Sequence, residues 1–244
     1  MSVEVEVLFL RLEGPFQSWG DNARWGLRDT RLEPTKSGLT GLIACCLGWG
    51  PDEDRQIAEL GSAFHLGIRV DRPGTPIRDF HTVEGGVMSA EGRVKRNASS
   101  KEPETVVSTR DYLADARFLA ALAASPPTLA LIESALSRPV WPFFLGRKSC
   151  VPSTPIYPAL PGRPSRGSYP SLFDALVSFP RLDRNDHVSS KRVVIEFDSP
   201  GATVPLNAVW QRRRDVPLSF RYRQFAYRDV AEGQANLKDE SEVA

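Results

Sequence analysis

The N-terminal segment constrains the fold more than any other, because it can only be accommodated in a sheet. Apolar residues recur at every second position from Val3 to Phe9, and Gly14-Pro15 ends the pattern. A period of two is typical of a strand with one strongly buried face. Such a strand has to pair with neighbours and cover its apolar side with other elements. The chain therefore requires a fold built on a sheet.

An amphipathic helix is predicted after this strand. The apolar residues that follow Pro34 fall at i, i+3, i+4, i+7 and i+8, namely Leu39, Leu42, Ile43, Cys46 and Leu47. This spacing places them on one face of a helix. Thr35 or Ser37 can cap its N-terminus, and Gly48 can end it. A strand followed by a helix thus opens the chain.

The same rhythm continues with one interruption. Helices are predicted over 51–60 and from 125 to 139, and strands over 64–70, 193–197 and 224–230. Residues 111–124 have the composition of a helix and the position of a strand. The pattern fails between His81 and Thr109, which indicates an inserted arm, and the residues from Glu232 onward read as a frayed acidic tail. The order predicts an α+β, ferredoxin-like core with an insertion.

Composition narrows the class of protein. Hydrophobic residues make up 41% of the chain, which excludes wholesale disorder, and 31 Lys and Arg against 30 Asp and Glu exclude a binder that relies on bulk charge. Three cysteines without CxxC or metal spacing predict free thiols, a reducing cytoplasmic setting and no metal. No apolar run is long enough for a membrane helix, so no membrane partner is expected. No GxxxxGK[ST] occurs, and no cofactor is predicted.

Positive charge is concentrated near the C-terminus. Residues 211–228 contain six Arg against one Asp, and Phe220, Tyr222, Phe225 and Tyr227 are interleaved with them. Guanidinium groups that bind phosphates, beside rings that stack on bases, are typical of single-stranded RNA sites. An edge strand protected by charge is the alternative. Six Arg exceed what edge protection requires, so we favour RNA or another polyanion.

Further basic residues are candidates for the same site. Lys36 and Ser37 stand at a predicted helix start, where free amides favour a phosphate, although the same residues also form an ordinary cap. Gly146 allows close backbone approach beside two cations, although such turns are often only solvated loops. The full RNA-binding prediction is Arg24, Arg28, Lys36, Ser37, Arg93, Lys95, Arg96, Arg110, Gly146, Arg147, Lys148, Ser149, Arg221, Arg223 and Arg228.

Several motifs together resemble one family. They are LRLEGPFQSWG at 10–20, PTKSGLTGL at 34–42, RDFHTV at 78–83, YLADA at 112–116, LGRKSC at 145–150, and QFA at 224–226 with Arg228. In this order and spacing the chain resembles the CasD subunit family of the type I-E CRISPR surveillance complex, Cascade. The resemblance covers most of the chain and is weakest over residues 152–186.

The resemblance implies a fold and a function. It implies a ferredoxin-like (RRM-like) core of the repeat-associated RNA-binding type, split over 1–80 and 110–150, with a thumb or arm over 81–109, a small β-rich C-terminal portion over 151–231 and a flexible acidic tail over 232–244. It favours a strand for 111–124. The implied role is non-catalytic: binding the 5′ handle of the guide RNA for antiviral targeting. The implied partners are that RNA, the backbone subunit, which the thumb contacts, and the large subunit near the protospacer-adjacent motif of target DNA.

Catalysis is the rival function. Related CRISPR subunits of type I-C systems cut repeat RNA without metal, and such a site needs a base and a cation at one phosphate. His81, Tyr112 and Lys36 are the weak candidates for a metal-independent endoribonuclease. In type I-E systems a separate subunit cuts the RNA, so the resemblance opposes this function. A scaffold without RNA contact, the third class, would leave the arginines of 211–228 without a partner.

Overall fold

The computed structural model describes residues 4–21, 26–85, 88, 92–94, 96–183, 185–197, 203–205 and 207–238. Its elements in chain order are β1 (Val5–Glu13), β2 (Phe16–Gln17), β3 (Leu27–Arg28), α1 (Lys36–Leu47), α2 (Asp54–Ser62), β4 (Phe64–Arg72), β5 (Thr75–Val83), β6 (Val106–Ala114), β7 (Arg117–Ala124), α3 (Pro126–Ser137), β8 (Arg166–Tyr169), α4 (Leu172–Ser178), β9 (Ser190–Glu196), β10 (Val209–Ser219) and β11 (Gln224–Asn236). Among these elements, none of the helices has the length and apolar character that crossing a membrane requires.

A seven-stranded sheet forms the centre of the molecule, in the order β10-β11-β9-β4-β7-β1-β8. Its neighbouring strands are antiparallel. Within it, β1, α1, β4, β7, α3 and β8 follow the β-α-β-β-α-β order of a ferredoxin-like unit. The predicted α+β, ferredoxin-like fold is therefore confirmed.

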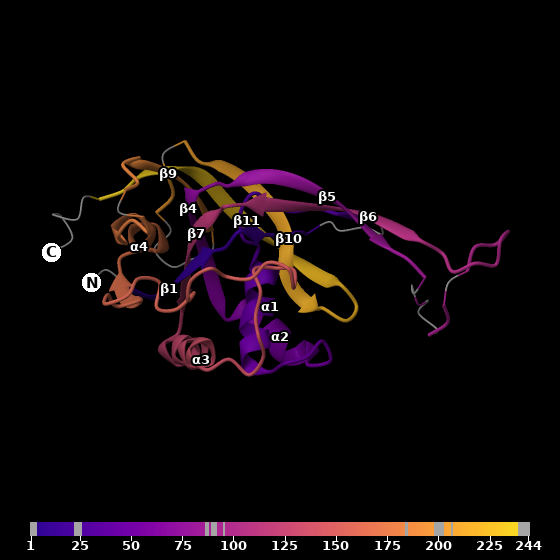
Figure 1. The fold of residues 1–244 in the computed structure, drawn as a ribbon. Coiled ribbons are helices and arrows are strands. Elements are labelled where there is room, and N and C mark those ends of the chain that lie inside the picture. Colours follow the sequence, from indigo (N-terminus) through magenta and orange to yellow (C-terminus); the bar gives the residue numbers. More distant parts are fainter. Residues whose placement is uncertain are drawn as a thin grey trace.

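Helices cover both faces of this sheet. Helices α1, α2 and α3 lie on one face and α4 lies on the other (Figure 1). Along β1, Leu8 and Leu10 pack in the first core, whereas Val7 and Phe9 pack in the second. The alternation predicted one strongly buried face, but α4 buries the other face as well.

The start and end of α1 agree with the sequence. The Thr35 hydroxyl accepts a hydrogen bond from the Gly38 amide at 3.2 Å, and Gly48 ends the helix at φ 76°. Leu39 and Ile43 are fully buried against the sheet. Helix α1 is thereby fixed with its first turn at the region where the basic residues gather.

A long hairpin interrupts the core between β4 and β7. Strands β5 and β6 pair from Thr75 opposite Ala114 to Val83 opposite Val106, and they project away from the body (Figure 1). The base of this arm therefore lies at Thr75 and Ala114 rather than at 81 and 109. Residues 111–124 form parts of two strands, because the chain turns at Asp115, with φ 56°, between β6 and β7.

The C-terminal strands extend the central sheet. Gly67 of β4 pairs with Ile195 of β9, and β9 pairs with β11. The predicted tail is wrong for its first residues, because β11 continues to Asn236 and buries Ala235 in the second core. Residues 239–244 lie outside the described part of the chain. Strands β8 and β10 and helix α4 were not predicted as elements.

Candidate nucleic-acid interface

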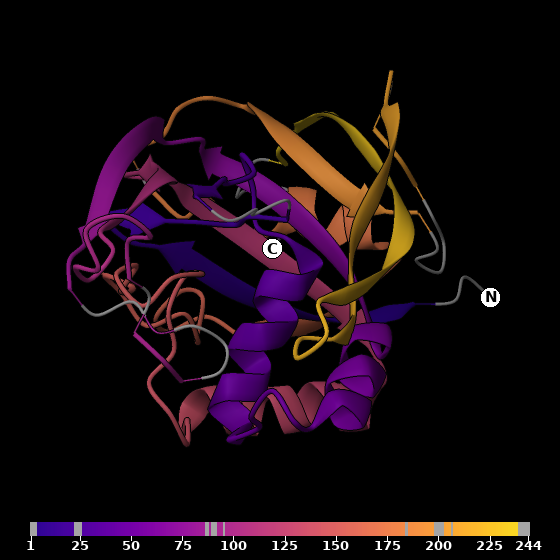
Figure 2. The same ribbon diagram turned by 90° about the vertical axis from the view of Figure 1, so that its right-hand side faces the viewer.

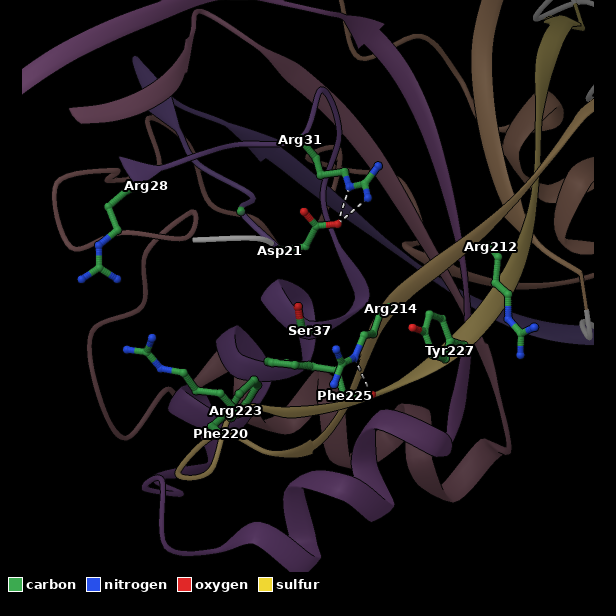
Figure 3. A pocket seen from close by; sticks show the side chains of 11 residues that line it. Asp21, Arg28, Arg31, Ser37, Arg212, Arg214, Phe220, Arg223, Phe225 and Tyr227 are labelled. Carbon is green, nitrogen blue, oxygen red and sulfur yellow. Dashed lines mark hydrogen bonds and ion pairs between the residues drawn. The ribbon is translucent and has the colours of Figure 1, made fainter. Parts of the chain in front are cut away.

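An open groove of about 540 Å³ lies where the β10–β11 hairpin meets the start of α1. Figure 2 shows the hairpin curling toward this helix, and Figure 3 shows the side chains of the groove. The lining residues are Gly20, Asp21, Arg28, Arg31, Ser37, Arg212, Arg214, Phe220, Arg223, Phe225 and Tyr227. Five arginines, three aromatic rings and one carboxylate thus share one concave surface.

Two arginines of the groove are available to a ligand. In the described part of the chain, no carboxylate lies within ion-pair distance of Arg28 or Arg223. Arg28 comes from β3 and Arg223 from the turn between β10 and β11, where its φ is 52°. The two side chains belong to opposite walls of the groove (Figure 3). Unpaired guanidinium groups are suited to bidentate contacts with phosphate.

Tyr227 lies between two other arginines. The guanidinium carbon of Arg212 is 4.9 Å from the centre of its ring, and that of Arg214 is 5.9 Å from it. Arg214 also donates to the Phe225 carbonyl at 3.3 Å, which fixes its direction. Because Tyr227 is 58% exposed, the ring and its cations remain open to solvent. Aromatic and guanidinium planes together form a surface on which bases can stack.

The carboxylate of the groove is already engaged. Arg31 donates from Nε to Asp21, and the same pair forms a salt bridge. A neutral pair on the rim does not cancel the charge of the remaining arginines. The groove therefore carries a net positive field at its open side.

The predicted phosphate site at the start of α1 is wrong for Lys36. This residue is 3% exposed, and its ammonium group donates to both oxygens of Glu196, at 2.8 and 3.0 Å. Burial lowers the pKa of Lys36, and the Glu196 carboxylate acts in the opposite direction without restoring it. The Lys36 amide is occupied as well, because it donates to Asp215 at 2.9 Å. Ser37 does line the groove, at 9% exposure.

Arg228 was also predicted to bind RNA, but the structure places its side chain in the interior. It is buried and donates to Asp215 twice, at 2.7 and 2.9 Å. Arg213 is likewise buried and donates to Glu33 at 2.6 Å. Both cations hold β10 and β11 to the body of the protein. The alternative of an edge strand also has support, since β10 is an edge strand of the sheet.

Arg147 positions the groove instead of lining it. Its guanidinium donates to the carbonyls of Asp111, Arg28 and Asp29 at 2.7–3.1 Å, and it stacks over Tyr112 at 4.7 Å. These contacts fix the segment that carries Arg28, and a direct RNA contact of the half-buried Arg147 stays a prediction.

The glycine of the same loop allows two segments of the protein's own backbone to pack closely. Gly146 has φ 101°, and a Cβ there would lie 1.8 Å from the Ser18 carbonyl oxygen. Its close approach is therefore to the protein's own backbone and not to a ligand. Lys148 and Ser149 are exposed and lie outside the groove.

The other predicted cations do not line this groove. Arg96 donates to the Lys101 carbonyl at 2.9 Å, Arg110 to the Ser108 hydroxyl at 3.2 Å, and Arg221 to Asp52 at 2.8 Å. Arg93 is exposed on the arm. Arg24 and Lys95 lie outside the described residues.

The three weak catalytic candidates do not converge. In the arm, His81 pairs with Ser108 whereas Tyr112 pairs with Ile77, so about 13 Å of strand separates them. Tyr112 is buried beneath Arg147. Lys36 is held by Glu196, as described above. The arrangement that this rival site required is not formed.

Sequence reasoning missed one cation of the groove, Arg31, and counted two others, Arg212 and Arg214, only as part of the basic segment 211–228 and not in the list of individual RNA ligands. The signal was present: along a strand, alternate residues share a face, so Arg212 and Arg214 lie opposite to the buried Arg213. For Arg31, nothing in the local sequence marks its contribution.

The fold and groove define a ferredoxin-like α+β protein with a basic surface groove, and comparison with known proteins identifies its family. The chain belongs to the CRISPR-associated protein family Cas_Cas5, whose family model matches residues 7–231. The family resemblance drawn from the sequence motifs is confirmed. Over 161 residues the chain is 35% identical to the "CRISPR system Cascade subunit CasD" of Escherichia coli (strain K12), covering 62% of this chain and 69% of that protein.

Two solved structures share the fold over nearly the whole chain. One, described as "Crystal structure of Cas protein", has a TM-score of 0.66 at 30% identity and covers 94% of this chain and 95% of that one. The other, described as "CRISPR RNA-guided surveillance complex", has a TM-score of 0.65 at 28% identity, with 95% and 90% covered.

Proposed function

We propose that this protein is a non-catalytic, RNA-binding subunit of a type I-E CRISPR surveillance complex, and that its groove holds the 5′ handle of the guide RNA. Similarity to CasD and to a chain of an RNA-guided surveillance complex supports the assignment to such an assembly. The arm of β5 and β6 would reach the backbone subunit, and contact with target DNA would run through the large subunit.

One observation carries the proposal: two arginines without carboxylate partners in the described part of the chain and a tyrosine stacked by two further arginines line the same groove. Arg28 and Arg223 supply cations without carboxylate partners among the described residues, and Tyr227 supplies an exposed ring between two further guanidinium groups. Phosphates would bind the former and bases would stack at the latter. A charged edge strand alone does not require this convergence from three separate segments.

The contact assignment is tested by RNA binding across a salt series. Replacing Arg28 or Arg223 by Ala removes one phosphate contact, so the log–log slope for a single-stranded RNA should become shallower by about 0.7 for each. Arg55→Ala is the matched control, because Arg55 is an exposed cation of α2 that does not line the groove. Slopes unchanged by both groove substitutions would count against the groove.

The absence of cleavage is tested separately. The full chain incubated with repeat RNA should leave that RNA intact, because the candidate residues His81, Tyr112 and Lys36 do not converge on one site. Appearance of a released 5′ handle that depends on His81 would instead establish the nuclease function. Co-purification of the chain with guide RNA and other complex proteins tests membership of the assembly itself.

A further inference from the structure

A pair of exposed aromatic rings lies next to the groove, on the outer surface of the sheet edge. Phe197 follows β9, and Trp210 belongs to β10. Their ring centres are 4.6 Å apart with the planes at 89°. Phe197 is 45% exposed and Trp210 52% exposed. Two large rings in contact with each other, and half open to water, need a physical explanation.

The strand register places both rings on one face. Trp210 lies opposite Ala231 of β11, and Ala231 lies opposite Ile195 of β9. Phe197 is two residues beyond Ile195, and it donates its amide to the Asp229 carbonyl. Because side chains two apart share a face, Phe197 and Trp210 rise from the α4 side of the sheet. The small side chain of Ala231 leaves room between them.

The same face leads directly into the groove. Arg212 is two residues after Trp210, its side chain is 71% exposed, and it stacks on Tyr227. Tyr227, Arg212 and Trp210 therefore alternate ring, cation and ring along neighbouring strands. The one acid in this row, Asp229, is 4.0 Å from Arg212, but the pair is exposed and its attraction is weak. The face remains suited to an anionic strand.

We propose that Phe197 and Trp210 form a second base-stacking site, which takes a nucleobase of the RNA strand after it leaves the groove past Arg212. The inference rests on the proposed function, because it extends the path of the same RNA. The two rings meet edge to face, because their planes are perpendicular. An edge-to-face contact holds the pair together and leaves a ring face open to a base. Stacking on open rings beside guanidinium groups is how sheet surfaces bind single strands.

The test compares two RNA lengths with the full chain. A short single-stranded RNA fills the groove only, and a longer one carries several further nucleotides. Trp210→Ala and Phe197→Ala should each weaken binding of the longer RNA on the order of tenfold and leave the short RNA unchanged. Trp210→Phe should retain most of the affinity. Trp141→Ala removes another exposed indole outside this face and is the control.

The outcomes separate the two proposals. If Tyr227→Ala weakens binding of both RNA lengths, and neither Trp210→Ala nor Phe197→Ala affects binding of the longer RNA, the groove is supported as an RNA site and the second stacking site is refuted. If none of these substitutions affects either length, the proposed function fails first. If Trp210→Ala spares RNA affinity but reduces co-purification with other proteins of the complex, the rings form a protein-docking surface and the inference is wrong. Unchanged thermal unfolding of the variants checks that folding is intact.

Discussion

The carboxylate of Asp215 accepts a hydrogen bond from the Lys36 amide at 2.9 Å, so β10 supplies an anion at the N-terminus of α1. That position would otherwise attract a phosphate. Arg228 holds the same carboxylate with two hydrogen bonds, and Glu196 holds Lys36. The charged groups nearest to the start of α1 therefore pair with one another, and these pairs join β10, β11 and α1. Among the described residues that line the groove, the cations on the outer side of β10 and in the loops remain for a ligand.

Acidification should weaken the fold through Asp215. Burial alone would raise the pKa of this carboxyl, but hydrogen bonds and positive charge from Arg228 outweigh it and lower the pKa. The stability from Asp215 is therefore present above its unfolded pKa of about 3.9 and is lost as pH falls through the lower folded value. Urea unfolding between pH 7 and pH 3 measures it.

Asp215→Asn provides the comparison for that titration. It should lower the free energy of unfolding by about 3 kcal/mol at pH 7, because Arg228 loses its charged partner in a buried site. The variant should then depend less steeply on acid pH than the unaltered protein. Two curves that run parallel down to pH 3 would show that Asp215 has no part in acid unfolding.

Arg69→Met should destabilise the protein strongly. Arg69 is fully buried, pairs with Asp71, and donates to the carbonyls of Leu176, Phe179 and Pro180. The substitution leaves the acid uncompensated and the end of α4 without its donors, at a cost of about 3–5 kcal/mol. Chemical denaturation measures the loss. Arg55→Ala, at an exposed pair, should change the free energy of unfolding by less than about 0.5 kcal/mol.

Two adjacent cations should behave differently. Arg147→Ala removes three hydrogen bonds to carbonyls and a stacked contact with Tyr112, so it should lower the melting temperature by several degrees and disturb RNA binding indirectly. Lys148→Ala removes the same charge from an exposed side chain and should leave the melting temperature in place. Equal effects of the two substitutions in a thermal scan would refute the positioning role of Arg147.

Gly146→Ala should be among the most damaging single substitutions. Its φ of 101° is unfavourable for Ala, and the added Cβ would lie 1.8 Å from the Ser18 carbonyl oxygen. Gly162→Ala is the matched control, because its φ is also positive, at 75°, while nothing lies within 4 Å of the added atom. Its cost should be about 1–2 kcal/mol. Soluble yield and unfolding midpoints of the two variants should differ clearly, and similar values would contradict the clash.

Local signals in the sequence identified the core elements well. The period of β1, and Thr35 and Gly48 at the ends of α1, follow from the backbone chemistry of single segments and were read correctly. The end of β11 was misjudged, since its polar residues Glu232 and Gln234 resemble a tail. Only the pairing with β9 and the burial of Ala235 reveal a strand.

The site was harder to predict because its charges are sorted by distant partners. Arg213 and Arg228 look like their exposed neighbours in the sequence, but both are buried. Arg213 pairs with Glu33, and Arg228 pairs with Asp215 and lies within ion-pair distance of Glu196. Gly146 and Arg147 form a motif typical of a ligand loop, yet they contact the chain's own carbonyls. Composition locates the region of positive charge. Tertiary pairing decides which of its members can meet an anion.

The continuity of the sheet from β1 to β10 has a thermodynamic consequence. Because β9 joins β4 directly, the wall of the groove that Tyr227 occupies belongs to the same hydrogen-bonded sheet as the ferredoxin-like core, and we expect the two to unfold together. Any ligand that selects the folded groove must then stabilise the entire sheet by mass action. A ligand bound in the groove should therefore raise the melting temperature of the whole sheet, including the strands farthest from the groove.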